Sequence, residues 1–391
     1  MTGLAQEPRR KRRHKSRLIM AAVLILLPMV LAFGAGEVWV RAYKIDIDLL
    51  SMTGDRPGQN PMAAWAVVDA FGAYRGRPGF EKAAWGKSIN NEGFISTPDL
   101  SVEKPSGTLR VAFLGGSSTA GQGGDLADVD TWPWQVAEAL RASHPDRSIE
   151  FLNAGLGGYS SFESMGMLWA RVRFFKPDVL VVCHGWNELY YWKASQMDDP
   201  TTWRRLSDGG WGFDGYLPKN PPLRPWPIDG LLHWSQLLTR ARLHLSPHVT
   251  GEAGSGATGA GGLLDHYDPR GADVWRTHLQ LLSATADTIG AELFVAKQPT
   301  LIVPDLSEDL RERCQYSHHG FDHDAHVAAF DHLYRVVEEV VPENRVIDLT
   351  SLSGRGDLFS DHVHPNPAGS GLIAEIVADA LLRNSALFSP R

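Results

Sequence analysis

A serine surrounded by small residues follows an apolar run near residue 115. Ser117 lies in GGSSTAG, residues 115–121, directly after LRVAFL at residues 109–114. Small neighbours let the chain turn sharply and leave the hydroxyl exposed, as a nucleophile requires. No lysine follows this segment, which disfavours a phosphate-binding loop. The sequence therefore predicts Ser117 as a catalytic nucleophile.

A carboxylate and an imidazole stand three residues apart in DHVHPN, residues 361–366. In a loop fixed by Pro365, Asp361 can hold the ring of His364 in one tautomer, so that its other nitrogen accepts a serine proton. His362 is the competing candidate for the base. The spacing from Asp361 and the adjacent proline favour His364, which we predict as the general base with Asp361 as its orienting partner.

Two further segments carry hydrogen-bond donors. NAGLGGYS, residues 153–160, has glycines that would expose backbone N–H groups, and GWNE, residues 185–188, presents the side-chain amide of Asn187. All four segments follow predicted strands, and open parallel sheets place their ligands at the carboxyl ends of strands. Four such segments in order are a much stronger signal than any one of them.

Near-continuous apolar runs alternate with helical patterns from residue 109 onward. This pattern predicts an α/β fold of three layers, with a parallel sheet of about five strands between helices. The predicted strands are residues 109–114, 149–153, 178–183, 292–296 and 345–349. The predicted helices are roughly residues 131–144, 161–175, 271–289, 322–341 and 366–384. Thr131 and Asn366 are predicted N-caps, each closely followed by a proline.

The four segments together resemble blocks I, II, III and V of the SGNH (GDSL-type) hydrolase superfamily. The resemblance covers roughly residues 109–385 and implies a flavodoxin-like α/β/α fold. It implies Ser117 as the nucleophile, His364 as the base and Asp361 as its partner. It also implies an oxyanion hole made by the backbone N–H groups of Ser117 and Gly158 and the amide of Asn187.

Two positions depart from the pattern of the superfamily. Gly116 stands where block I has an aspartate, and Glu188 stands where block III has one. These departures leave the reaction class unchanged and make the substrate pocket harder to infer. INNEGF, residues 89–94, ahead of KPSG, residues 104–107, resembles the lead-in of membrane-anchored bacterial members.

The N-terminus combines a basic tail with an apolar run. Residues 1–17 hold seven Lys and Arg against one acid, and residues 18–36 carry no charge. A run of this length can span a bilayer, and the cations orient the tail to the cytoplasm. We predict a basic cytoplasmic tail at 1–17, a transmembrane signal-anchor at 18–39 and a stalk or N-terminal cap at 40–107. The hydrolase domain at 108–388 would then be extracytoplasmic; a cleaved signal peptide and a buried soluble helix are the alternatives.

An insertion at about residues 190–270 holds several tryptophans among prolines and glycines. It is too long for an ordinary βα loop. It would form either a lid or sugar-stacking platform, or a subdomain that uses tryptophan in its core. Its second part, residues 251–262, contains six glycines and is predicted to be a flexible loop. Trp186, Glu188 and Trp192 are the predicted substrate contacts.

Composition excludes several classes of function. The chain has 38 Lys and Arg against 45 Asp and Glu, and without the basic tail the balance is 31 against 44, which argues against a nucleic-acid-binding body. Cys183 and Cys314 are too few for a disulfide framework or a four-thiolate zinc site, although a bond between them stays open. The histidines and acids at 314–326 allow a metal site, but a solvated helix start is favoured. The predicted chemistry requires no metal and no cofactor.

These observations predict a membrane-anchored serine esterase that removes short acyl groups, acetyl above all, from carbohydrate outside the cytoplasm. Hydrolysis and transfer share one acyl-enzyme, so an O-acyltransferase acting on a cell-surface or exported polysaccharide is an alternative. A lipid esterase is another alternative. An inactive glycan-binding or assembly scaffold is the alternative from a different class of protein.

Overall fold

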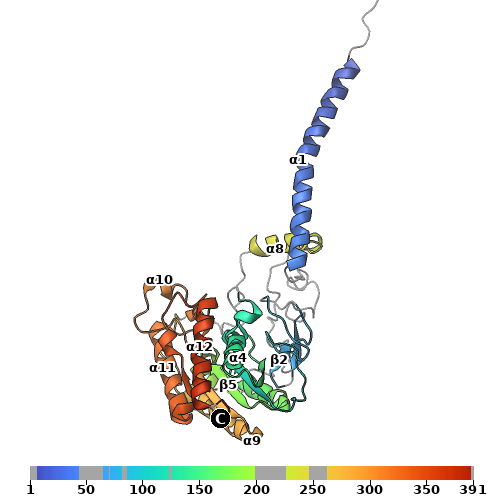
Figure 1. The fold of residues 1–391 in the computed structure, drawn as a ribbon. Coiled ribbons are helices and arrows are strands. Elements are labelled where there is room, and N and C mark those ends of the chain that lie inside the picture. The colour runs from blue at the N-terminus through green and yellow to red at the C-terminus, as the bar shows by residue number, and fades with distance from the viewer. Residues whose placement is uncertain are drawn as a thin grey trace, which may run out of the picture. The chain divides into compact units, whose positions relative to one another are not determined.

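The computed structural model describes residues 7–43, 65–69, 71–81, 86–122, 126–198, 226–245 and 262–388. They belong to two compact units (Figure 1). The first unit takes residues 1–61 and 221–249, and the second takes residues 62–220 and 250–391.

Five parallel strands form the central sheet of the second unit, in the order β4-β3-β5-β6-β7. They are β3 (Thr108–Gly115), β4 (Ser148–Asn153), β5 (Val179–His184), β6 (Glu292–Lys297) and β7 (Val346–Asp348). Every residue of β5 is buried, because the strand has a neighbour on each side and helices above and below it. The predicted five-stranded parallel sheet is confirmed, and each strand lies within one or two residues of its predicted limits.

Five long helices cover the two faces of this sheet. They are α4 (Trp132–Ser143), α5 (Ser161–Ala170), α9 (Arg270–Ile289), α11 (His323–Val340) and α12 (Pro367–Asn384). Helix α4 packs against α12, whereas α9 packs against α5 and α11 (Figure 1). The crossovers β3 to β4 and β4 to β5 run in opposite directions across the sheet, so the right-handed rule puts α4 and α5 on opposite faces. The result is a three-layer α/β/α arrangement.

The predicted N-caps differ in what their side chains do. The carboxamide oxygen of Asn366 accepts a hydrogen bond from the backbone N–H of Gly369 at 3.0 Å, which caps α12. Thr131 precedes α4 but its hydroxyl donates backwards to the carbonyl of Asp128 at 2.8 Å. Thr131 therefore stands at the predicted N-cap position, but its side chain bonds to the preceding turn and makes no capping bond to α4.

Shorter elements complete the second unit. They are the helices α3 (Ser117–Ala120), α6 (Ala194–Asp198) and α10 (Glu308–Arg311), and the 3-10 helices η2 (Asp128–Asp130), η3 (Val172–Phe175), η4 (Trp186–Tyr191), η7 (Tyr316–His318), η8 (Glu343–Arg345) and η9 (Thr350–Leu352). Both cysteines are buried and neither forms a disulfide.

An antiparallel hairpin of β1 (Ala66–Asp69) and β2 (Ala73–Gly76) lies in the segment predicted as a stalk or cap. Tyr74 packs with Ile89, Tyr159 and Met167 in a small apolar cluster separate from the main core. The hydroxyl of Tyr74 donates to the carbonyl of Gly157, and the hydroxyl of Tyr159 donates to the carbonyl of Tyr74. The hairpin is thereby joined to the loop that follows β4.

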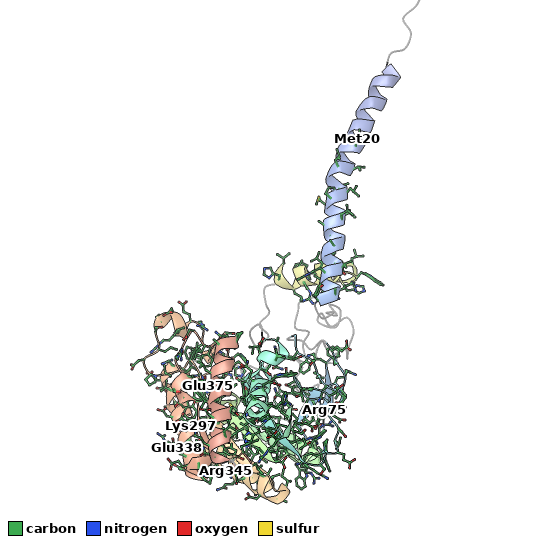
Figure 2. All side chains as sticks on the ribbon, viewed as in Figure 1. Met20, Arg75, Lys297, Glu338, Arg345 and Glu375 are labelled. Atoms are coloured by element: carbon green, nitrogen blue, oxygen red, sulfur yellow. The ribbon has the colours of Figure 1, made fainter. Side chains whose placement is uncertain are left out.

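The first unit contains α1 (Glu7–Tyr43), α7 (Asp229–Leu232) and α8 (Gln236–Leu245). The carboxylate of Glu37 accepts the backbone N–H groups of Gln236 and Leu237, each at 2.9 Å, and so caps the start of α8. Exposed apolar side chains such as Met20 project from α1 (Figure 2). Within the described residues, none of the helices combines the length and the apolar character needed to cross a membrane. The anchor predicted at residues 18–39 therefore finds no support here.

Candidate active site

The four predicted segments lie at the carboxyl edge of the sheet. The chain leaves β3 toward β4 on one side, whereas β5, on the other side of β3, leads away toward β6 and β7. Ligands of open α/β sheets bind where the strand order reverses in this way. Ser117 follows β3 and Asn187 follows β5, so both flank this point.

Ser117, His364 and Asp361 form a continuous hydrogen-bonded chain. The Oγ atom of Ser117 lies 2.7 Å from Nε2 of His364, and Nδ1 of the same ring lies 2.6 Å from Oδ2 of Asp361. The imidazole side chain retains 19% of its exposure, so a substrate can reach it from solvent. These distances are those of a nucleophile, a base and an orienting carboxylate.

The carboxylate of Asp361 is fixed by more than the imidazole. Its Oδ1 atom accepts the backbone N–H groups of Val363 and His364, each at 2.8 Å. Burial alone would raise the pKa of Asp361, but hydrogen bonds and the charge interaction with His364 hold that pKa well below its ordinary value. Asp361 is therefore ionised and oriented at neutral pH, as a partner for an imidazolium must be.

The predicted oxyanion donors come from three segments: the start of α3, the loop after β4 and the helix η4. The Nδ2 atom of Asn187 donates to the carbonyl of Tyr159 at 2.8 Å, which fixes the position of the amide, and an amide nitrogen carries two N–H donors. Ser117 is the first residue of α3, where a backbone N–H has no acceptor within the helix. Gly158 has φ of +72°, a left-handed conformation that glycine adopts without strain.

Gly116 explains how Asn187 comes so close to the nucleophile. A β-carbon at Gly116 would lie 2.7 Å from Nδ2 of Asn187 and 3.0 Å from the carbonyl oxygen of Tyr159. Both distances are shorter than normal contacts of a carbon atom. A side chain at this position would therefore displace the amide of Asn187 or the backbone of Tyr159.

The structure buries all three predicted substrate contacts, Trp186, Glu188 and Trp192. Glu188 is only 3% exposed, and its carboxylate accepts the backbone N–H of Ser161 at 2.6 Å and the hydroxyl of Ser161 at 2.8 Å. Trp192 is 1% exposed and packs against Tyr267. Both side chains face the interior because they join the segment after β5 to neighbouring elements, so they support the site from behind. The insertion's central part, residues 199–225 and 246–261, lies outside the described residues.

Trp186 is also buried, and it lies among four histidines. Its ring centroid is 4.1 Å from those of His319 and His362, and it stacks on His326 and His318 at 5.5 and 5.7 Å. Burial lowers the pKa of His326 and of His362 to about 4, so these rings are neutral at pH 7. Within the described ranges, no group of three or more His, Cys, Asp or Glu side chains is arranged to hold a metal ion. The metal alternative at 314–326 therefore finds no support.

Sequence reasoning missed Gln298, which joins three segments of the site. Its Nε2 atom donates to the hydroxyl of Ser118 at 2.8 Å, and its Oε1 atom accepts the backbone N–H of Trp186 at 2.7 Å. The hydroxyl of Ser118 in turn donates to the carbonyl of Val363 at 3.0 Å. The nucleophile, amide and base segments are thus tied together by one buried glutamine after β6. A polar residue at the end of an apolar strand was the available signal.

Comparisons with known proteins find similar solved structures at low sequence identity. No protein-family profile matches this chain, and no curated protein matches it. Among solved structures it is similar to an alpha/beta hydrolase enzyme from the metagenome of Lake Arreo, Spain, with 16% identity, a TM-score of 0.39, and coverage of 72% of this chain and 97% of that one. It is similar to a catalytic mutant of Axe2, an acetylxylan esterase from Geobacillus stearothermophilus, with 14% identity, a TM-score of 0.39 and coverage of 72% and 97%. It is also similar to the acetyl xylan esterase AlAXEase, with 14% identity, a TM-score of 0.39 and coverage of 70% and 100%.

Proposed function

We propose that the α/β unit is a serine ester hydrolase of the SGNH type that works through an acyl-enzyme. The observation that carries this proposal is the hydrogen-bonded chain from Ser117 through His364 to Asp361, with distances of 2.7 and 2.6 Å. The amide of Asn187, which is held by the carbonyl of Tyr159, would stabilise the negative charge that develops on the ester carbonyl oxygen. A glycan-binding scaffold would have no use for an ionised, oriented Asp–His pair beside a serine hydroxyl.

The reaction follows from these contacts. The Oγ atom of Ser117 attacks the ester carbonyl while Nε2 of His364 takes its proton, and the negative carbonyl oxygen is stabilised by Asn187 and the backbone N–H of Ser117. As the ester C–O bond breaks, the imidazolium returns the proton to the leaving alcohol. Water then attacks the acyl-enzyme with His364 again as base, and the carboxylic acid and free serine are released. Asp361 stabilises the imidazolium at both steps.

We propose short acyl groups on carbohydrate, acetyl above all, as the substrate class. This finer proposal is supported by the sequence of residues 190–227, where apolar residues stand apart among tryptophan, glycine, proline and polar residues. A channel for long acyl chains would instead require runs of leucine, isoleucine and phenylalanine. Transfer of the acyl group from Ser117 to a sugar hydroxyl, in place of hydrolysis by water, is the alternative reaction and can be measured with the same protein.

Labelling with a fluorophosphonate probe tests the proposed reaction directly. Ser117→Ala and His364→Ala should abolish labelling and the turnover of p-nitrophenyl acetate without unfolding the protein. His266→Ala is a matched control, because His266 forms an exposed pair with Asp265 at 2.7 Å. Labelling of folded Ser117→Ala at the rate of the natural protein would overturn the mechanism.

We also propose that the α/β unit works outside the cytoplasm. The support is the cluster of seven cations ahead of the uncharged residues 18–36. A C-terminal fusion to alkaline phosphatase, which is active only after export, should be active in a bacterial host. The same fusion with all seven cations replaced by glutamine is the comparison. An inactive fusion of the natural sequence would show that the α/β unit is not exported and would overturn the proposed location.

A further inference from the structure

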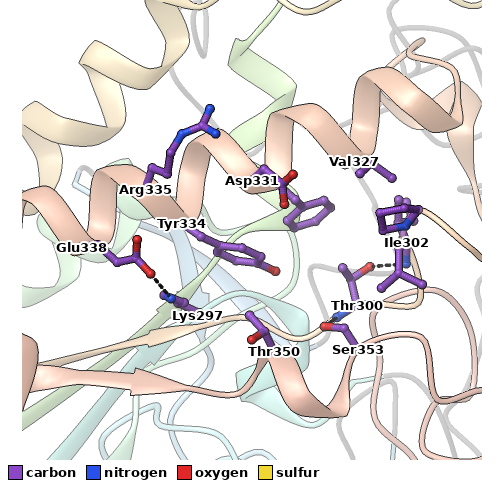
Figure 3. Close-up of a pocket in the computed structure, with 13 residues that line it drawn as sticks. Lys297, Thr300, Ile302, Val327, Asp331, Tyr334, Arg335, Glu338, Thr350 and Ser353 are labelled. Carbon is purple, nitrogen blue, oxygen red and sulfur yellow. Dashed lines mark hydrogen bonds and ion pairs between the residues drawn. The ribbon is translucent and has the colours of Figure 1, made fainter.

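A separate cavity of about 350 Å³ lies between α11 and the loops that follow β6 and β7 (Figure 3). Its wall on α11 includes Phe330, Asp331, Tyr334 and Arg335. This volume is at the lower end of the range found for small-molecule sites, which suits one or two sugar rings better than a polymer segment. None of its lining residues belongs to the proposed catalytic triad.

The walls combine aromatic, hydroxyl and charged groups. Thr350 and Ser353 contribute half-buried hydroxyls opposite α11 (Figure 3). Thr300 is only 1% exposed, and its hydroxyl already donates to the carbonyl of His362 and accepts the backbone N–H of Ile302. The half-buried ring of Tyr334 offers flat apolar surface for the C–H face of a sugar, whose oxygens can bond to hydroxyls and charged groups. Phe330 is only 2% exposed and supports this ring from the core.

The charges of the cavity are balanced. The ammonium of Lys297 is already paired with Glu338 at 2.5 Å and with Asp348 at 3.3 Å (Figure 3). Of the two other charged residues of the lining, Asp331 is negative and Arg335 is positive, and both are exposed. A lining without excess charge favours a neutral, hydroxyl-rich ligand over an anion or a cation.

Two residues of the cavity contact the segments that hold the proposed active site. The hydroxyl of Tyr334 donates to the carbonyl of Gln298 at 2.5 Å, and the side chain of Gln298 bonds Ser118 and Trp186. Those two residues are direct neighbours of Ser117 and Asn187 in the chain. One short path therefore leads from the cavity wall to the nucleophile and amide segments.

Thr300 provides a second path. Its hydroxyl donates to the carbonyl of His362 at 2.9 Å, and the backbone N–H of Leu301 donates to the same carbonyl at 2.9 Å. His362 lies between Asp361 and His364 in the catalytic loop. Thr300 thus joins the wall of the cavity to the loop that carries the base.

We propose that this cavity is a second, non-catalytic binding site for one or two neutral sugar rings, and that its occupation raises the activity at Ser117. Binding energy at one site changes function at another only if the ligand favours one arrangement of the groups between them. Here those groups are Tyr334 with Gln298 and Thr300 with the catalytic loop. The binding part is independent of the proposed function, whereas the coupling part rests on it.

Calorimetric titration of the full chain carrying Ser117→Ala tests binding without turnover. The probes are five neutral disaccharides: xylobiose, cellobiose, maltose, lactose and N,N′-diacetylchitobiose, with glucuronic acid for comparison. At least one disaccharide should bind, and Asp331→Ala or Arg335→Ala should weaken it tenfold or more. Asp324→Ala, also exposed on α11 but outside the cavity, is the matched control. Absence of binding by all five, or binding unaffected by both cavity variants, would overturn the site.

The turnover of p-nitrophenyl acetate by the natural chain tests coupling. This ester is too small to need the cavity, so a saturating disaccharide should raise kcat/KM about fivefold or more. Tyr334→Phe keeps the ring and removes the hydrogen bond to Gln298, so it should bind the sugar within about twofold and lose most of the increase. An undiminished increase in Tyr334→Phe, or no increase in the natural chain, would overturn the coupling. Sugar binding without labelling of Ser117 would leave the second site standing and refute the proposed hydrolase.

Discussion

Replacing Gly116 with alanine is the sharpest test of the geometry at the proposed oxyanion hole. The new methyl group would lie 2.7 Å from Nδ2 of Asn187 and 3.0 Å from the carbonyl oxygen of Tyr159. These two atoms are the donor and acceptor of one hydrogen bond of 2.8 Å. The backbone carbonyl cannot move easily, so the amide should rotate away and leave its position beside the nucleophile.

The expected cost falls on the transition state more than on folding. Removal of one oxyanion donor costs about 10² to 10³ in kcat, or roughly 2.7–4 kcal/mol. Gly116 has φ of −87°, which alanine adopts without backbone strain. The cost in unfolding free energy should therefore come from the crowding alone, roughly 1–3 kcal/mol, equivalent to several degrees in Tm.

Measurements of kcat/KM for p-nitrophenyl acetate and of Tm would separate these effects. Gly371→Ala is the matched control, because a β-carbon there meets only Oε1 of Gln135 at an ordinary 3.5 Å. Asn187→Ala should cost a similar factor, and the double variant should cost little more than either single one, because both remove the same donor. A folded Gly116→Ala protein with kcat/KM within threefold of the natural protein would refute this account of Asn187.

Three further predictions concern the carboxylate, acid stability and the acyl group. Asp361→Asn should lower kcat about 10⁴-fold with little change in Tm, since the imidazole loses its orienting acceptor; a loss below tenfold would contradict its role. Because burial lowers the pKa of His326 and His362 from 6.5 to about 4, the unfolded chain binds more protons than the folded chain between these values. The free energy of unfolding should therefore fall as the pH drops from 6.5 to 4, by on the order of 1 kcal/mol per histidine and pH unit; His326→Gln with an unchanged slope in urea titrations would contradict this. Across p-nitrophenyl esters from two to twelve carbons, kcat/KM should be highest at two, and a maximum at eight or beyond would favour a lipid substrate.

The sheet was predictable from the sequence because buried parallel strands consist of short apolar runs. Because each of the four polar segments follows a predicted strand, all four could be placed at the carboxyl edge of the sheet. Ser117, Asp361 and His364 could therefore be assigned before any geometry was known. The structure brings these three side chains within hydrogen-bonding distance, although their catalytic role stays a proposal.

The supporting groups could not be predicted in the same way. Gln298 bonds residues 180 and 112 positions away in the chain, and no local pattern indicates such partners. Glu188 was predicted as a substrate contact, and in the structure the turn of η4 directs its carboxylate to Ser161 in the interior. Sequence spacing indicates which end of a strand a residue occupies, whereas the direction of a side chain in a 3-10 turn depends on the packing around it.

The hairpin of β1 and β2 has a consequence for where this chain can be shortened. A fragment that begins at residue 108, where the strand pattern starts, would contain the whole sheet and all three triad residues. It would lack Tyr74, whose hydroxyl holds the carbonyl of Gly157 and whose own carbonyl is held by Tyr159. Tyr159 is also the residue that anchors the amide of Asn187. The smallest fragment that keeps the proposed site intact is therefore longer than the strand pattern suggests, and its N-terminal boundary must precede Trp65.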